Sequence, residues 1–311
     1  SIISRDGEEK PTVYVPMVYV PYALSIFGAE TKNEWKLPVD LELLSQYFNV
    51  VTDTPSETLT GNPDKDGNTM ASVDDITRAT SAELKDVDFA LAVIQDPLNE
   101  GSYFTGFGYD YETEAYIPIS LQYGPYTADS EFVRKESISG DMIKKEVDGG
   151  YGVSIVEEKE NRSYFGQDSN VINYEDLNTV KYAKETVPAG VAVIAAIKSD
   201  GPMIFSEIDA YADGILIAFG KSIGSGYGIE TEALIQIAAG QYEPYGLLPV
   251  QMPADMLTVE AQLEDVPRDM TAYTDAAGNT YDFTFGMNWS GVISDSRTEK
   301  YNVAPLTAPT K

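Results

Sequence analysis

Three apolar runs decide the fold of this chain: VDFALAVI at residues 87–94, GVAVIAAI at residues 190–197 and GILIAFG at residues 214–220. Each run has the length of a strand, and none alternates between apolar and polar residues as a half-exposed strand would. Continuous runs of this kind are typical of parallel strands that are buried on both faces. We therefore expect the three segments to lie in one open sheet.

Amphipathic segments surround these runs. Helices are expected at residues 39–48, 73–86, 174–187, 203–211 and 229–239. A further strand is expected at residues 13–20, where Pro16 indicates an edge or a bulge, and a short one at residues 49–51. Strand-like pieces follow at residues 247–253 and 281–285. This alternation predicts an α/β fold with an open, mostly parallel sheet and helices on both faces.

One long segment interrupts the alternation. Residues 99–173 are rich in tyrosine, glycine and charge, and the segment is too long for an ordinary connection from a strand to a helix. Insertions at the carboxyl ends of parallel strands usually line a ligand site. The simplest organisation is one domain over residues 13–295 that carries this insertion, with a linker at 1–12 and an extended tail at 296–311.

Composition excludes several kinds of chemistry. The chain has 50 acidic and 21 basic residues, and a net charge of -29 repels nucleic acid and anionic membrane surfaces. No apolar run approaches the roughly 20 residues of a membrane-spanning helix. The sequence contains no cysteine and no histidine, so acid/base chemistry is left to carboxylates, tyrosine or lysine.

Two motifs that suggest ligands fail in detail. Residues 64–75 partly match a calcium-binding loop, but Thr69 stands where that loop requires glycine, so a turn stabilised by Asp and Asn side chains is the better interpretation. Residues 214–222 lack the spacing of a nucleotide-binding P-loop. We expect no metal and no cofactor.

Four segments together resemble the carboxyl-terminal α/β-sandwich domain of glycoside hydrolase family 3. They are residues 86–94 (DVDFALAVI), 191–202 (VAVIAAIKSDGP), 240–253 (GQYEPYGLLPVQMP) and 281–289 (YDFTFGMNW). Residues 119–126 and 252–256 are similar to a clostridial-type branch of that family. The arginine of the family's third motif is replaced here by Leu247.

The resemblance implies a role in retaining hydrolysis of β-glucosides or β-xylosides. It implies that residues 1–12 lead from a (β/α)8 barrel domain or chain that bears the aspartate nucleophile, so that this chain alone is inactive. The implied substrate is an oligosaccharide or β-glycoside, and the implied location is secreted or at a bacterial cell surface. A homo-oligomer is a further possible partner arrangement. The rival hypothesis is a non-catalytic sugar-binding or structural surface protein that kept only the fold.

Retaining glycosidases need two carboxyl groups about 5 to 5.5 Å apart. In the family, the acid/base is a glutamate on a loop after an apolar strand of this domain, which makes Glu100 the first candidate and Asp96 the second. The alternative for Glu100 is an exposed loop carboxylate, and the alternative for Asp96 is a turn or cap residue before Pro97. Glu112 and Glu114 are remoter candidates.

Aromatic residues of the insertion have two possible roles. Tyr103 and Phe104, next to Glu100, are the candidates for contact with a sugar ring. The other aromatic residues are expected to form a small core that holds the insertion together. These are Tyr109, Tyr111, Tyr116, Tyr123 and Tyr126.

Overall fold

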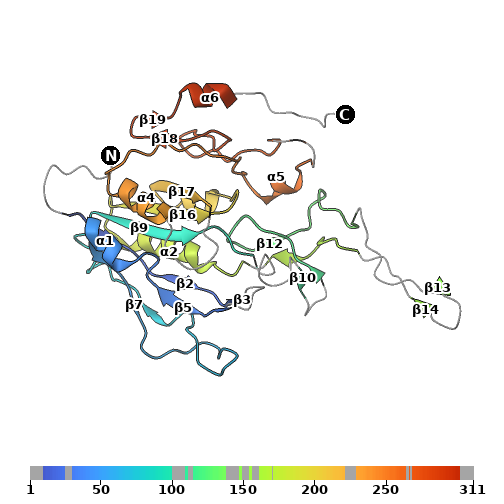
Figure 1. Ribbon diagram of the computed structural model, residues 1–311, viewed down its shortest axis with the longest axis horizontal. Coiled ribbons are helices and arrows are strands. Elements are labelled where there is room, and N and C mark those ends of the chain that lie inside the picture. Colours follow the sequence, from blue (N-terminus) through green and yellow to red (C-terminus); the bar gives the residue numbers. More distant parts are fainter. Residues whose placement is uncertain are drawn as a thin grey trace.

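The central feature of the fold is a parallel sheet of five strands. The computed structural model describes residues 10–24, 30–99, 109–110, 115–137, 147–148, 154–155, 161–169, 171–220, 229–263, 266 and 268–301. The strands of the sheet are β1 (Thr12–Tyr14), β6 (Asn49–Val51), β9 (Phe89–Gln95), β16 (Ala192–Ser199) and β17 (Gly214–Phe219). They lie in the order β17-β16-β9-β1-β6, and every neighbouring pair is parallel (Figure 1).

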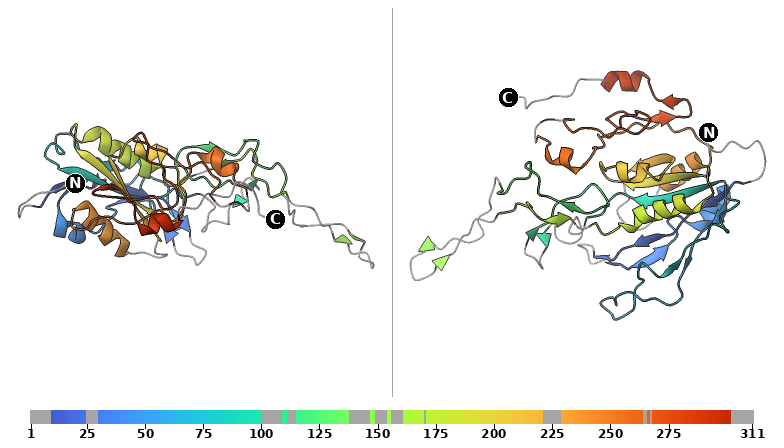
Figure 2. Two further views of the ribbon diagram at one scale, coloured as in Figure 1. Left: turned by 90° about the horizontal axis from the view of Figure 1, so that it is seen from above. Right: turned by 180° about the vertical axis from the view of Figure 1, so that it is seen from behind.

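Helices cover both faces of this sheet. The helices are α1 (Leu41–Tyr47), α2 (Glu175–Thr186), α3 (Ser206–Asp209), α4 (Ile229–Ala238), α5 (Met256–Glu260) and α6 (Ser296–Tyr301). Helices α1 and α4 contact each other on one face, and α2 and α3 lie on the other (Figure 2). The expected α/β fold with helices on both faces is thus confirmed. In the part of the chain that the structure describes, no helix has the length and hydropathy to cross a bilayer.

The alternation of side chains along β9 shows why its apolar run is continuous. Phe89, Leu91 and Val93 pack with α1 and α4, whereas Ala90 and Ile94 pack with α2 and α3. Because successive side chains of a strand point to opposite faces, a strand with two buried faces needs an apolar residue at every position. The same division holds along β16, whereas β17 lies at an edge of the sheet and is half-buried along its length, so the expected burial on two faces is wrong for the third run.

Short antiparallel strand pairs form separate two-stranded sheets outside the five-stranded sheet. They are β2 (Val18–Val20) with β5 (Glu34–Lys36), β3 (Ala23–Leu24) with β4 (Glu30–Thr31), β7 (Thr54–Pro55) with β8 (Ile76–Thr77), β10 (Tyr109–Asp110) with β11 (Ala115–Tyr116), β12 (Tyr126–Thr127) with β15 (Asp168–Ser169), β13 (Val147–Asp148) with β14 (Ser154–Ile155), and β18 (Met287–Asn288) with β19 (Gly291–Val292). Three of these pairs, β10–β11, β12–β15 and β13–β14, lie within the predicted insertion between β9 and α2.

The predicted strand at residues 13–20 is wrong in two respects. The segment is divided at Pro16 into β1 and β2, and β1 lies inside the sheet between β9 and β6 rather than at an edge. The proline falls after β1, where its missing N–H costs the sheet no hydrogen bond. The break sends β2 into a separate pairing with β5.

The predicted helix at residues 73–86 is also wrong. This segment holds β8 and a turn in place of a long helix. The carboxylate of Asp75 accepts hydrogen bonds from the backbone N–H groups of Thr60 and Ser72, at 2.7 and 2.8 Å, and from the Thr60 hydroxyl at 2.8 Å. These bonds hold the segment against the loop at Thr60, 15 residues earlier. In residues 73–86, the backbone bond from the Leu84 N–H to the Thr80 carbonyl closes a single turn.

The carboxyl-terminal region is less regular than predicted. Residues 247–253 and 281–285 form no strands, although they pair through single hydrogen bonds such as Leu248 N–H to the Phe285 carbonyl, 2.7 Å, and Met252 N–H to the Tyr281 carbonyl, 3.0 Å. Helix α3 is shorter than the predicted helix at 203–211, and the expected extended tail begins with α6. The domain boundaries at residues 12 and 295 stay predictions.

Aromatic rings join this region to the sheet domain. Tyr281 lies 5.2 Å from the Phe205 ring, 5.4 Å from Tyr273 and 4.9 Å from Phe285, measured between ring centroids. Burial, followed by the nearby carboxylates of Asp275 and Asp209, raises the pKa of Tyr281 to about 12. The phenol therefore holds its proton to a higher pH in the folded chain than in the unfolded one.

This difference predicts a loss of stability in alkali. A raised folded-state pKa stabilises the fold below the unfolded value of about 10, and that contribution is lost as the pH rises from about 10 to about 12. Tyr281→Phe should flatten the fall in the free energy of unfolding over that window, measured by urea titration at several pH values. Tyr245→Phe is the control because the Tyr245 side chain is 73% exposed. An equal effect of both changes would contradict the assignment to burial.

Candidate functional site

The carboxyl edge of the sheet holds Asp96, the one catalytic candidate among the described residues. Strands β1 and β9 are neighbours, yet the connection from β1 to β6 contains α1, which lies on one face, and the connection from β9 to β16 contains α2, which lies on the other. Open parallel sheets usually bind ligands at such a switch point, outside the carboxyl ends of the strands. Asp96 and the start of the insertion follow β9 directly at this point.

Asp96 joins the ends of two adjacent strands. Asp96 is 9% exposed, and its Oδ2 accepts hydrogen bonds from the Ser199 hydroxyl at 3.1 Å and the Asp200 N–H at 2.9 Å. Its own N–H donates to the Lys198 carbonyl at 3.0 Å. Asp96 thus extends the pairing of β9 and β16 beyond the last strand residues, in keeping with the turn or cap role considered for it.

Asn173 and Asp176 hold the start of α2 against the same edge. The Gln95 N–H donates to Asp176 Oδ2 at 3.0 Å, and the Leu98 N–H donates to Asn173 Oδ1 at 2.7 Å. The Asn173 amide in turn donates to the Asp96 carbonyl and to Asp176 Oδ2, both at 3.0 Å. The two ends of the insertion, far apart in sequence, are therefore fixed to one place.

A second set of bonds fixes the base of the insertion. Asn99 Oδ1 accepts from the Ser120 N–H at 2.7 Å and the Ser169 hydroxyl at 3.0 Å, while its amide donates to the Ser120 carbonyl at 2.9 Å. Glu207 of α3 accepts the backbone N–H groups of Tyr123 and Gly124, at 2.6 and 2.8 Å. The described base of the insertion is consequently anchored at two places, at Asn99 and at residues 120–124.

Tyr123 and Tyr126 serve the structure of the insertion. Tyr123 is 2% exposed and its hydroxyl donates to the Gln95 carbonyl. Burial, followed by the nearby carboxylates of Asp176, Asp96 and Glu207, raises its pKa well above the ordinary value. Tyr126 donates to Glu260 of α5, and burial is the main cause of its raised pKa. Both contacts agree with the expected core role.

The first-choice site residues lie outside the described residues. Glu100, Tyr103 and Phe104 belong to this group, and so do the remoter candidates Glu112 and Glu114. Their roles stay predictions. The structure describes the frame from which they extend, namely the end of β9 and the Asn99 bonds.

The loop at residues 64–75 is a turn stabilised by its own side chains. Asp64 Oδ1 accepts the N–H groups of Asp66 and Asn68, at 2.9 and 2.8 Å, and Asp64 Oδ2 accepts from Lys32 at 2.7 Å. The Lys32 ammonium and the Asn68 amide are the leading causes of the lowered pKa of Asp64. Within the described ranges, no three acidic side chains gather as a metal site would require.

A buried ion pair near the switch point was not predicted from the sequence. Asp53, which is 3% exposed, accepts hydrogen bonds from the Tyr14 hydroxyl at 2.7 Å, the Met17 N–H at 2.9 Å and the Ala79 N–H at 2.9 Å. Arg78 completes the set with a 2.8 Å contact to Asp53 Oδ2. The only available signal was the position of Asp53 just after the strand at residues 49–51.

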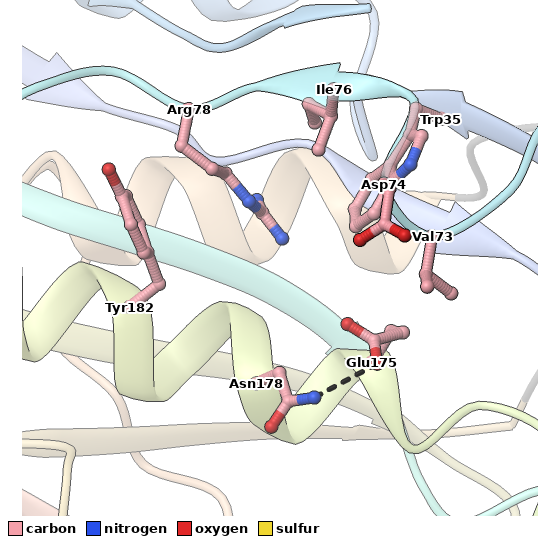
Figure 3. A pocket seen from close by; sticks show the side chains of 8 residues that line it. All are labelled: Trp35, Val73, Asp74, Ile76, Arg78, Glu175, Asn178 and Tyr182. Carbon is pink, nitrogen blue, oxygen red and sulfur yellow. Dashed lines mark hydrogen bonds between the residues drawn. The ribbon is translucent and has the colours of Figure 1, made fainter.

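Arg78 also forms one side of a pocket. Its guanidinium lies 4.5 Å from the Trp35 ring centroid and 5.5 Å from that of Tyr182. The pocket, of about 290 Å³, lies between α2 and the segment that contains β8 (Figure 3). Its lining residues are Trp35, Val73, Asp74, Ile76, Arg78, Glu175, Asn178 and Tyr182.

Comparison with known proteins gives partial matches to beta-glucosidases. The chain is 32% identical over 96 residues to a probable beta-glucosidase C of Aspergillus oryzae, which is 31% of this chain and 14% of that protein. It is 31% identical over 91 residues to beta-glucosidase C of Emericella nidulans, covering 29% of this chain and 13% of that protein. The match thus spans about one seventh of the length of these relatives. No family model and no solved structure matches.

These matches support a relation between this chain and glycoside hydrolases. They agree with the coarse part of the resemblance, a likeness to β-glucosidases, and the relatives are fungal. The much greater length of those proteins is consistent with a domain that works beside other domains.

The Asp53 network predicts a large stability effect. Asp53→Ala would leave the Arg78 charge and the Tyr14 hydroxyl without their buried acceptor, which should lower the free energy of unfolding by about 3–5 kcal/mol. Glu34→Ala is the control, because the contact of Glu34 with Lys36 is exposed and worth about 0–1 kcal/mol. Urea unfolding followed by circular dichroism measures both. A loss below about 1 kcal/mol for Asp53→Ala would show that the network does not support the fold.

Asp96 gives a second prediction, on local structure. In Asp96→Asn, the group that meets the Ser199 hydroxyl and the Asp200 N–H is either an NH2, which cannot accept from them, or a neutral carbonyl oxygen, which accepts more weakly than a carboxylate. The free energy of unfolding should therefore fall by about 1–3 kcal/mol. Hydrogen exchange of the Asp200 amide should accelerate more than exchange in the middle of β16. Unchanged exchange at Asp200 would show that the 2.9 Å contact does not protect this edge.

Proposed function

We propose that this chain is the α/β-sandwich domain of a retaining β-glycosidase of family 3, secreted or displayed by a bacterium. The observation that carries the proposal is the combination of partial identity to beta-glucosidases with an insertion tied to the carboxyl edge of the sheet. The domain docks on a barrel that bears the aspartate nucleophile. Its substrate is a β-linked glucoside or xyloside.

In this mechanism, Glu100 works as the acid/base. The barrel aspartate attacks the anomeric carbon while Glu100 gives its proton to the departing glycosidic oxygen, which leaves a glycosyl ester on the aspartate. Glu100 then removes a proton from water as the water attacks the same carbon. The ester bond breaks, the sugar is released, and both carboxyl groups return to their starting states.

The described geometry favours Glu100 over Asp96 for this role. A general acid must present its carboxyl oxygen to the leaving group within hydrogen-bond distance. Asp96 Oδ2 is engaged by Ser199 and Asp200, and the residue is 9% exposed. Glu100 follows Asn99, whose side chain is bound to Ser120 and Ser169, so the loop leaves a fixed position at the edge of the sheet.

An exposed aromatic surface supports docking to a further domain. Tyr242, Tyr245 and Trp289 have 60%, 73% and 53% of their surface exposed. The backbone N–H of Trp289 donates to Glu243 Oε1 at 3.1 Å, which brings the two segments that carry these rings together. We propose that these rings belong to the surface that the barrel domain covers.

The test uses the intact enzyme with its barrel domain. Glu100→Ala should lower kcat/KM for substrates with poor leaving groups by about 100- to 10,000-fold, because proton transfer to the leaving oxygen is lost. The variant should keep more of its activity on activated aryl glycosides, because their leaving groups depart without a proton from Glu100. Added azide should increase the turnover of these substrates by attacking the glycosyl ester. Glu185→Ala, an exposed acid on α2, is the matched control. Normal activity of the Glu100 variant would move the role to Asp96, Glu112 or Glu114.

A further inference from the structure

The pocket beside α2 has unused hydrogen-bond donors on one wall. An arginine side chain has five N–H donors. Arg78 Nη1 donates to Asp53 and to the Met17 carbonyl at 3.0 Å, and Nη2 donates to the Thr179 hydroxyl at 3.1 Å. Among the described residues, no acceptor meets the Nε–H or the second Nη2–H. The guanidinium extends from the β8 segment into the space above α2 (Figure 3).

Acceptors lie on both walls of the pocket. Asp74, on the same segment as Arg78, is exposed at the rim, and Glu175 and Asn178 are half-buried on α2 (Figure 3). The Asn178 amide donates to Glu175 Oε1 at 2.9 Å, which orients both side chains and leaves the Asn178 Oδ1 and Glu175 Oε2 positions for other donors (Figure 3). The pocket therefore combines donors and acceptors at short range.

Aromatic residues hold this arrangement rigid. The Trp35 residue is 7% exposed, and its indole N–H donates to the Ser72 carbonyl at 3.1 Å. The Tyr182 hydroxyl donates to the Ala79 carbonyl at 2.9 Å, so its ring is fixed along the pocket wall. Because Asp53 fixes Arg78 as well, the polar groups are preorganised rather than free to rotate away.

We propose that this pocket binds a neutral polyhydroxylated ring, such as a single sugar. An anion would meet Asp74 and Glu175 in a protein of net charge -29, and a cation would meet Arg78. A neutral hydroxyl group can accept from Arg78 and donate to Asp74 or Glu175 at the same time. The volume of about 290 Å³ is just below the range for small-molecule pockets, roughly 300–1,000 Å³, which suits a ligand no larger than a single sugar ring.

This inference goes beyond the proposed function. The pocket is lined by residues of β5, β8, their flanking segments and α2, and includes neither Asp96 nor the loop that follows it. Binding here requires no catalysis and no barrel nucleophile. Its failure would leave the proposal for Glu100 untouched.

The test uses the two tryptophans of the chain as paired reporters. Trp35 lines the pocket and Trp289 lies on the exposed surface. In protein labelled with ¹⁵N at the indole, titration with D-glucose should shift the Trp35 resonance saturably with a Kd of about 1 mM, and should leave Trp289 in place. Trp289→Phe assigns the two signals.

Variants separate a built site from a general solvent effect. Asp74→Ala and Asn178→Ala should each weaken glucose binding about tenfold, because each removes a hydrogen-bonding partner of the sugar. Glu185→Ala on α2, outside the pocket, should leave it unchanged. The proposal is overturned by a Trp35 signal that does not saturate, by equal shifts of both indoles, by unchanged affinity in the Asp74 and Asn178 variants, or by inorganic phosphate shifting Trp35 when glucose does not.

Discussion

The carboxylate of Asp53 is the constraint on which the arrangement of this domain depends. This one buried side chain accepts hydrogen bonds from Tyr14 on β1 and from Met17, between β1 and β2. It also accepts hydrogen bonds from Arg78 and Ala79, between β8 and β9. A buried carboxylate is tolerated only when its acceptor positions are filled, so these four donors are held together. The result links strands of the sheet to the irregular chain that separates them.

The site follows from that link. Arg78 reaches from Asp53 to Thr179 on α2, and the beginning of the same helix is bound to the end of β9 through Asp176 and Gln95. Helix α2 is therefore fixed at two points, one beside the pocket and one at the carboxyl edge. Since the insertion enters at β9 and returns at α2, this fixation also determines where its two ends lie.

Sequence reasoning predicted the parts of the fold that local pattern controls. The strands predicted from the apolar runs at 87–94 and 190–197 are confirmed as β9 and β16, because a strand that is buried on both faces requires apolar residues along its length. It failed at 73–86, where the Asp75 carboxylate ties the chain to Thr60, a contact without a periodic signal. The Asp53 network was missed for the same reason, because its partners are dispersed along the chain. The candidate loop was predicted only from its place after the apolar run at 87–94, and the role of Glu100 stays a prediction because that residue lies outside the described part of the chain.

The bonds around Asp96 explain why the insertion can be long without losing its position. Chain closure costs only about 0.6 kcal/mol for each doubling of loop length, so the length of the insertion is tolerated when its ends are held. Asp96 fixes the exit from β9 against Ser199, and Asn173 fixes the return by binding the Asp96 carbonyl. The same bonds therefore give Asp96 an anchoring role at this edge of the sheet, because its Oδ2 holds Ser199 and Asp200 and its carbonyl holds Asn173.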